Sequence, residues 1–374
     1  MVVFLDELPW MAVPKSKLIQ ALDHVWNTQF STMPKVILVV CGSAATGGLH
    51  NRITRRIRLA PFNLREAVNF LKTRNVDLGL KATTELYLAV GGVPLYLNQV
   101  DKRLSASQNI AALCFSENGL LRTEFNSLFR ALFGESAIYE KIVRAQATKR
   151  NGITRTQLLL ALGTESGGSL NRKLNELEEA GFISHLTPYD KRIKNTVYRI
   201  IDPYVYFYLS WIERAPGGVF SANGEKYWLE KHRTASYQAW AGYSFENLCL
   251  THAPWVQKAL KLDHISCVVG SWNYVPPKGR ASDSGTQIDL LFDRSDGLIS
   301  LCEIKFNSAI FTVDKDYARE LKRKIEVFQT ITKTRKKIQL VLITLGDFKP
   351  NAWSEDLIDI ALNAGDIFSA ASVP

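Results

Sequence analysis

The clearest pattern in the chain is a pair of alternating apolar strands joined by a polar turn, within residues 287–306. Because strand side chains alternate between two faces, one face of this pair is entirely apolar and the other carries charged residues. A three-residue loop that pairs Arg294 with Leu298 would place Asp289 opposite Glu303, with Cβ atoms about 5 Å apart. The pattern therefore predicts a β-hairpin that brings two carboxylates together.

Two carboxylates at this spacing repel each other unless a cation lies between them. Mg²⁺ is typically held by one or two carboxylates together with water and phosphate oxygens. Lys305 follows Glu303 by two residues on the same face, where its ammonium group can orient a water or stabilise a phosphate. A surface hairpin with an ordinary Glu–Lys pair is the alternative interpretation, because the spacing alone also occurs by chance.

Asp289 followed by an E-x-K sequence at Glu303 and Lys305 resembles the core of the PD-(D/E)xK nuclease superfamily. The resemblance implies a further acidic residue on a preceding helix, and Glu246 stands in the matching place. It also implies that Asp289, Glu303 and Glu246 bind Mg²⁺ and that Lys305 lies near the attacking water. Residues 215–374 are then expected to form a restriction-endonuclease-like α/β domain.

Beyond the hairpin, helical spacing predicts a helix over residues 314–332. Gln329 on that helix is a further polar candidate for the metal site. A fully buried strand is expected over residues 338–344, and a closing helix over residues 353–362.

The first residues read as a buried strand that ends in Asp6 and Glu7, and a second apolar strand, 35–41, precedes Ser43. A buried strand ending in two acids is typical of P-loop ATPases, where the acids hold Mg²⁺ and polarise the attacking water. Ser43 would then lie at the carboxyl end of a parallel strand, where such sheets bind ligands. The alternative is an α/β unit whose strand happens to end in two acids.

Residues 47–62 and 91–97 resemble the corresponding segments of the archaeal-type AAA ATPase family. Members of that family carry an AAA-like ATPase, a winged helix and a nuclease-like C-terminal domain, so the expected fold is multidomain α/β. The resemblance implies a partial P-loop core that begins at the Walker B strand, a helical lid, a winged helix and the nuclease-like domain, at residues 1–62, 63–134, 135–214 and 215–374.

The chain departs from that family because it contains no G-x-x-x-x-G-K-[ST] loop. Without the backbone N–H groups and the lysine of that loop, the phosphates of ATP lose their cradle. We therefore expect little ATP binding, unless the start is misassigned or a complementing chain supplies the loop. A homo-oligomer is a further possible assembly. Arg52 and Arg55 are candidates for a nucleotide-facing arginine, and the alternative is that they face solvent.

Between residues 135 and 214 the pattern predicts helix, helix, turn, helix and β-hairpin, with an N-cap at Thr154, a capping box to Gln157 and a helix end at Gly163. This is the winged-helix layout, whose second turn helix enters the major groove of DNA. The alternative is a domain-docking spacer, because acidic residues follow on the same helix. Candidate DNA contacts on the expected exposed face and at the hairpin tip are Asn171, Arg172, Lys173, Lys191, Arg192 and Lys194.

The formal net charge of the chain is +10, and residues 1–150 hold 19 Lys and Arg against 11 Asp and Glu. This excess favours an anionic partner such as DNA or a nucleotide. Five cysteines without a C-x-x-C spacing predict reduced thiols and a cytoplasmic protein. No apolar run reaches about 18 residues, so no membrane span is expected.

Three functions remain open from the sequence. The first is a Mg²⁺-dependent nuclease that the winged helix positions on DNA. The second is a nucleotide-switched regulatory or defence ATPase, whose C-terminal domain does not cleave. The third is an inactive, truncated remnant of such an ATPase.

Overall fold

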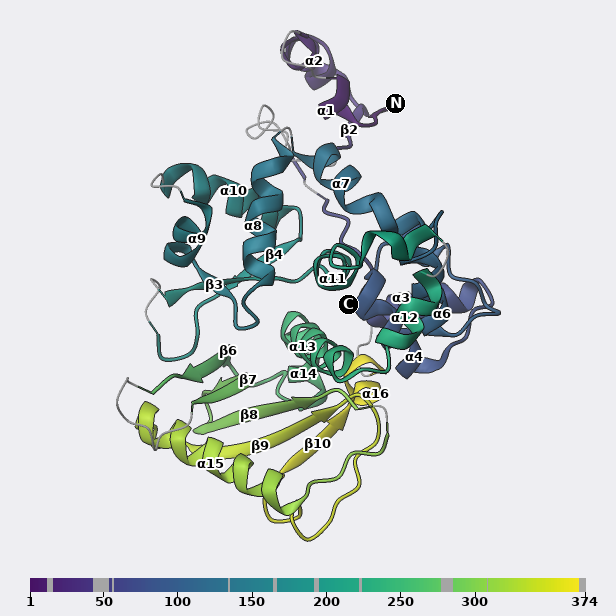
Figure 1. Ribbon diagram of the computed structural model, residues 1–374. Helices are drawn as coiled ribbons and strands as arrows, with labels where there is room; N and C mark the ends of the chain where they lie inside the picture. The colour runs from purple at the N-terminus through teal and green to yellow at the C-terminus, as the bar shows by residue number, and fades with distance from the viewer. Residues whose placement is uncertain are drawn as a thin grey trace.

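The computed structural model describes residues 1–11, 16–42, 54–55, 57–133, 135–163, 167–191, 195–221, 224–276, 285–307 and 309–369. It is a mixed α/β protein in which a helical region lies between a small N-terminal unit and a C-terminal sheet (Figure 1). Ser43, Arg52, Arg192 and Lys194 lie outside the described residues.

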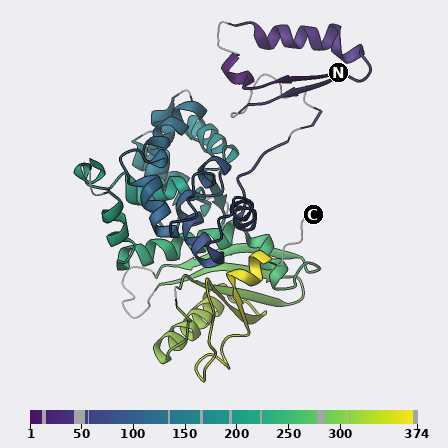
Figure 2. The ribbon, with the colours of Figure 1, turned by 90° about the vertical axis from the view of Figure 1, so that its right-hand side faces the viewer.

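The N-terminal unit is a parallel pair of short strands, β1 (Val2–Leu5) and β2 (Ile37–Val40). Helices α1 (Leu8–Met11) and α2 (Leu18–Thr28) connect them, and Figure 2 shows the unit set apart from the rest of the protein. The expectation of a buried first strand is wrong, because Val2 and Phe4 are 66 % and 59 % exposed. Val2 and Phe4 pair with Ile37 and Val39 of β2, which are exposed as well, so no layer of described residues covers this face of the two-stranded sheet.

The lid region is a group of helices with well-defined starts. Asn63 and Ser105 each form a capping box, with Glu66 and Gln108 respectively, which satisfies backbone N–H groups at the first turn. The helices of this region are α3 (Leu64–Thr73), α4 (Gly79–Val90), α5 (Pro94–Leu97), α6 (Ala106–Cys114) and α7 (Leu120–Leu132).

The middle unit has the three helices and the two hairpin strands expected from the sequence, and it adds a short strand between the first two helices that was not expected. The capping box between Thr154 and Gln157 is confirmed, and Gly163 ends its helix in the left-handed conformation with φ of 62°. The unit's small antiparallel sheet has the strand order β3-β5-β4. Its elements are α8 (Ser136–Ala147), β3 (Ile153–Thr154), α9 (Arg155–Leu162), α10 (Gly167–Glu179), β4 (Ile183–Leu186) and β5 (Val197–Ile200).

An aromatic-rich segment joins the middle unit to the helices before the sheet. It contains α11 (Pro203–Phe207) and a π-helical turn (Tyr208–Ile212), and most of its side chains are buried. Helix α12 (Gly224–Lys231) then packs against α6, where the rings of Phe115 and Trp228 stack with centroids 5.2 Å apart. None of the described helices is long and apolar enough to cross a membrane.

The C-terminal sheet is mixed, with the strand order β10-β9-β8-β7-β6. Its antiparallel part is β6 (Cys267–Tyr274), β7 (Thr286–Arg294) and β8 (Leu298–Lys305), and its parallel part continues from β8 into β9 (Lys337–Thr344) and β10 (Ile360–Asn363). Its helices are α13 (Ala235–Thr251), α14 (Ala253–Ala259), α15 (Lys315–Thr332) and α16 (Ala364–Ser369).

Helices cover both faces of this sheet (Figure 1). On one face α13 packs on β7 and β8, and the apolar cluster there is continuous with the core of the lid helices and the middle unit. On the other face α15 packs on β7, and Leu321 and Phe328 belong to a separate apolar cluster. One face of the sheet therefore belongs to an apolar core that extends through most of the described chain.

The closing helix expected over residues 353–362 is wrong. Residues 352–357 form turns, and the Asn351 backbone N–H donates to the Ser354 hydroxyl at 2.9 Å. Asp359 then accepts a hydrogen bond from the backbone of Leu340 in β9, which draws the chain into the parallel strand β10. The first three residues of β9 are not buried, so that strand is buried only from Leu340 onward.

Candidate active site

The hairpin of β7 and β8 has the register predicted from the sequence. Leu290 pairs with Cys302 and Asp293 with Ile299, which is the predicted register, and the paired residues of β7 and β8 end at Leu290. Asp289 follows next to a register shift between β6 and β7. The backbone N–H of Ile304 donates to Asp289 at 3.3 Å, which fixes that carboxylate beside the neighbouring strand.

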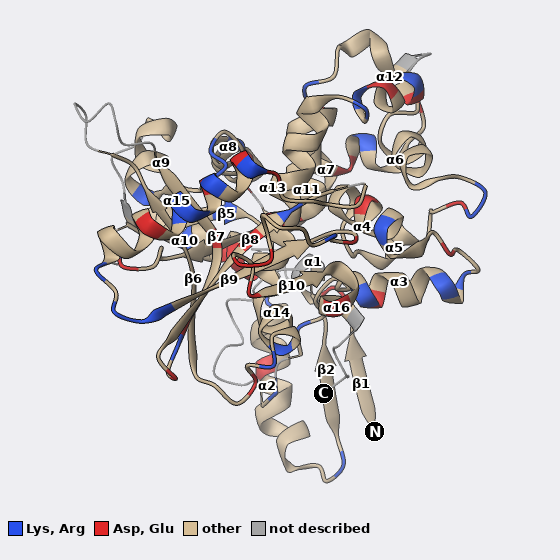
Figure 3. Ribbon diagram, turned by 90° about the horizontal axis from the view of Figure 1, so that it is seen from below, with Lys and Arg blue, Asp and Glu red and all other residues tan. Residues whose placement is uncertain are grey.

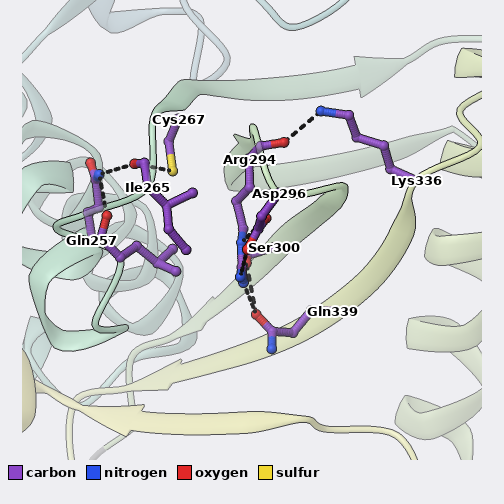
Figure 4. Close-up of polar contacts among 9 residues, drawn as sticks. Gln257, Ile265, Cys267, Arg294, Asp296, Ser300, Lys336 and Gln339 are labelled. Atoms are coloured by element: carbon purple, nitrogen blue, oxygen red, sulfur yellow. Dashed lines mark hydrogen bonds and ion pairs between the residues drawn. The ribbon is translucent and has the colours of Figure 1, made fainter.

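A polar network around Arg294 holds the turn of this hairpin (Figure 4). The guanidinium group of Arg294 is ion-paired with Asp296 in the turn and donates to Gln339 of β9 at 3.1 Å. Ser300 also donates to Gln339, and the ammonium group of Lys336 donates to the Arg294 carbonyl at 2.7 Å. The turn is thereby tied to the adjacent strand, which opposes a slip of register that would turn the carboxylates to the other face.

The structure brings together the four residues that the sequence singled out in this half of the chain. Glu246 of α13, Asp289 of β7, and Glu303 and Lys305 of β8 line one pocket of about 420 Å³. Lys324 of α15 lines it too, and Figure 3 shows the acidic positions of β7 and β8 with basic positions on α15. Gln329, the other candidate on α15, is exposed and is not among the described lining residues.

Glu303 is the most constrained acid of the pocket, with an exposed fraction of 3 %. Its carboxylate accepts hydrogen bonds from the Tyr317 hydroxyl and the Lys324 ammonium group, both at 2.7 Å, and pairs with Lys305 at 3.1 Å. Burial favours the neutral acid, but the attraction of the two ammonium groups outweighs burial, so the pKa of Glu303 is lowered. Glu303 is therefore ionised at neutral pH.

Sequence reasoning missed Tyr317 and Lys324 as partners of Glu303. Both residues lie on α15, seven positions apart, and a separation of two helical turns places side chains on one face. The sequence shows that Tyr317 and Lys324 share a helical face. It does not show that this face packs against the strand that carries Glu303.

The pKa values of Asp289 and Glu246 are both raised. For Asp289 burial is the main cause, followed by repulsion from Glu303, and its pKa is about 6. For Glu246 burial again comes first, followed by repulsion from Asp289, and its pKa is about 8. Lys305 and Arg199 lower the pKa of Glu246, but their attraction does not offset burial and the repulsion from Asp289 and Glu303.

We expect these raised pKa values to make folding stability depend on pH. Between the unfolded values near 4 and the raised values, the folded protein binds more protons than the unfolded chain. The free energy of unfolding should therefore fall as pH rises from about 5 to about 8. Urea unfolding at several pH values, with a chelator present, measures this slope.

The variant Glu246→Gln should flatten this pH dependence, because the amide does not titrate. Glu320→Gln is the matched control, since Glu320 has a lowered pKa and titrates below this range. A slope that Glu246→Gln leaves unchanged would show that Glu246 does not have a raised pKa.

The donor chemistry of the pocket suits a divalent cation. Carboxylate oxygens are the ligands that Mg²⁺ prefers, and the mutual repulsion of Glu246 and Asp289 is relieved by positive charge. Glu303 already contacts two ammonium groups. In the described part of the chain, no three His, Cys, Asp or Glu side chains stand close enough together to hold a metal ion as arranged.

The middle unit contributes to the same pocket. Arg150 and Asn151, in the segment between α8 and β3, line it together with residues of the hairpin. Tyr189 of this unit contacts the C-terminal sheet through a backbone bond to Ser271 at 2.8 Å and a hydroxyl bond to Asp293 at 3.0 Å. The pocket thus lies between two structural units that touch directly.

The candidate DNA contacts of the middle unit are only partly exposed. Asn171 and Arg172 on α10 and Lys191 after β4 are exposed. The expectation that Lys173 belongs to the exposed face is wrong, because Lys173 is 8 % exposed and its ammonium group donates to Ser169 at 2.9 Å.

The nucleotide-associated candidates lie far from the pocket in sequence and outside its lining. Asp6 and Glu7 form an exposed turn directly after β1, and Arg55 is also exposed. The pocket lined by Glu246, Asp289, Glu303 and Lys305 is called the carboxylate pocket. None of the three nucleotide-associated candidates is among its described lining residues.

Comparison with solved structures gave matches, but comparison with protein families and curated proteins gave none. A solved structure, the Walker-type ATPase PABY2304 of Pyrococcus abyssi, aligns over 56 % of this chain with 22 % identity and a TM-score of 0.35. The alignment spans 62 % of that ATPase, and a TM-score this low does not establish a shared fold.

Proposed function

We propose that the pocket at the β7–β8 hairpin hydrolyses phosphodiester bonds of DNA with the help of Mg²⁺. The observation that carries this proposal is the convergence of Glu246, Asp289, Glu303 and Lys305, from three separate elements, on one pocket. The raised pKa values of Glu246 and Asp289 support it, because perturbed acids in a cleft are typical of functional sites.

Each residue has a role that follows from its surroundings. Glu246 and Asp289 would hold the Mg²⁺ ion. Glu303 would add negative charge to the pocket and orient the ammonium groups of Lys305 and Lys324. When bound, the metal polarises a phosphate oxygen and lowers the pKa of a bound water. Lys305, about one-third exposed, is placed to stabilise the negative charge that develops on the phosphate.

The middle unit would hold the DNA. Its order of helices and strands is typical of winged-helix domains, and exposed Asn171, Arg172 and Lys191 offer groups that bind phosphates or base edges. Arg150 lines the pocket from this side, so the same unit can contact the backbone next to the bond that is cleaved. The contact is expected to weaken as salt concentration rises.

The experiment is a cleavage assay with supercoiled plasmid and with single-stranded DNA, each with Mg²⁺, with Mn²⁺ or with a chelator. We expect nicked or linear products that require the metal. Absence of any metal-dependent product with the purified full chain on both substrates would refute the proposal.

A nucleotide-switched regulator is the second candidate. It is favoured by the parallel pairing of β1 and β2 and by the two acids, Asp6 and Glu7, that follow β1. ATP binding by the full chain without DNA cleavage would support this candidate, with the C-terminal pocket in a non-cleaving role.

A further inference from the structure

A second pocket, of about 500 Å³, lies where the lid helices, the middle unit and the helices above the sheet meet. This volume is within the range of roughly 300–1,000 Å³ that is usual for small-molecule sites. Its walls are mainly apolar, with contributions from Pro61, Leu88, Ile201, Leu248 and Trp255. Segments from three parts of the chain therefore enclose one space, which we call the junction pocket.

Helix α13 separates the junction pocket from the carboxylate pocket. Ser244, Asn247 and Thr251 are three and four residues apart, so they share one helical face, and all three line the junction pocket. Gly242 and Glu246 are four residues apart, so they share another face of the helix, and both line the carboxylate pocket. The two sites therefore lie on different sides of one helix, and a ligand in one does not occupy the other.

The junction pocket contains polar groups that a ligand can satisfy. Ser244 is 7 % exposed, and its hydroxyl group has no hydrogen-bond partner in the described structure. His252 has its Nδ1 2.9 Å from the Leu248 carbonyl, so Nδ1 carries the proton and Nε2 remains an acceptor. Burial lowers the pKa of His252, which keeps the ring neutral at pH 7. Ser244 and His252 thus bring a buried hydroxyl without a partner and a neutral imidazole to the lining, beside the polar residues Asn63, Asn247 and Thr251.

The charge of the junction pocket disfavours a polyphosphate. Arg58 is the one Lys or Arg among the described lining residues, and Glu66 and Asp202 lie in the same lining. The aromatic side chains of Tyr206 and Trp255 offer surfaces on which a flat ring can pack. The site therefore combines apolar area, hydrogen-bond acceptors and hydroxyl groups with one cation against two acids.

We propose that the junction pocket binds an uncharged, flat heteroaromatic molecule of nucleoside size. Its ring packs between the apolar walls, and its polar edge exchanges hydrogen bonds with Ser244 and His252. Binding holds the lid helices, the middle unit and α13 together, because residues of all three enclose the ligand.

Isothermal titration of the full chain with adenosine, guanosine, cytidine and uridine tests this proposal, with ATP as the anionic comparison. At the efficiency usual for ligands of this size, we expect a Kd of about 0.1 mM for at least one nucleoside. ATP should bind at least about tenfold more weakly than adenosine, because its phosphates meet the acids of the pocket.

Two variants test whether the nucleoside binds in the junction pocket. Thr251→Trp, at an exposed position on the pocket rim, should abolish nucleoside binding because the indole occupies the space. Ser244→Ala should weaken it by roughly twofold to tenfold through loss of one hydrogen bond. Circular dichroism and thermal unfolding verify that both variants are folded.

Glu246→Gln and Asp6→Asn are the controls for the carboxylate pocket and the N-terminal unit, and both should retain wild-type nucleoside affinity. The proposal is overturned if none of the four nucleosides binds saturably to the wild-type chain. It is equally overturned if folded Thr251→Trp binds as well as the wild type, or if either control variant abolishes binding.

Discussion

Replacing Asp289 by asparagine is expected to lower the rate of metal-dependent DNA cleavage at least about 100-fold. The change removes a negative charge from the site where the divalent ion would bind and leaves the shape of the side chain unchanged. Metal ions contribute several kcal/mol of transition-state stabilisation, and each 1.4 kcal/mol is a factor of ten in rate. Single-turnover cleavage of a labelled duplex, at saturating Mg²⁺, measures the effect.

The matched control is Asp293→Asn, which makes the same chemical change on the same strand. Asp293 is bonded to Tyr189 and Lys336 and does not line the carboxylate pocket, so its variant should cleave within about threefold of the wild type. Equal rates for Asp289→Asn and the wild type would show that the pocket is not the catalytic centre.

Glu303→Ala is expected to lower the free energy of unfolding by about 3 kcal/mol. The alanine leaves the largely buried ammonium group of Lys324 and the hydroxyl of Tyr317 without their acceptor. Removing one partner of a buried ion pair typically costs about 3–5 kcal/mol, and the lower value applies because Lys305 is one-third exposed and can be solvated. Urea unfolding at pH 7 measures the loss.

A double variant separates charge from packing. In Glu303→Leu with Lys324→Leu, apolar side chains replace the closest ion pair, and the stability should recover most of the loss. Glu320→Ala is the control on the same helix, because its ion pair with Arg323 is solvent-exposed and contributes less than about 1 kcal/mol. A loss for Glu303→Ala no larger than that of Glu320→Ala would contradict a buried ionic cluster.

The local pattern predicted the hairpin and its register, because strand alternation and the turn residues are properties of adjacent positions. The start of α9 at Thr154 was equally predictable, since a capping box involves residues only three positions apart. The sequence also predicted which acids would face the carboxylate pocket from β7 and β8.

Tertiary contacts decided the features that sequence reasoning got wrong or missed. Lys173 has a charged side chain on a helix, yet it is buried with Ser169 as its partner. Residues 353–362 were expected to form a helix, but the bond of Asp359 to Leu340 favours a strand beside β9. The approach of α15 to Glu303 depends on the packing of distant segments, which a single sequence does not reveal.

The apolar cluster that continues from the lid helices to one face of the C-terminal sheet has a consequence for how the protein melts. Residues as distant in sequence as Leu64 and Phe368 belong to it. Unfolding of one unit would therefore expose buried apolar side chains of the others to water. The body of the chain should therefore unfold in a single cooperative step. Two fragments produced by cutting the chain after residue 214 would each expose apolar surface. We expect them to aggregate and not to fold as independent domains.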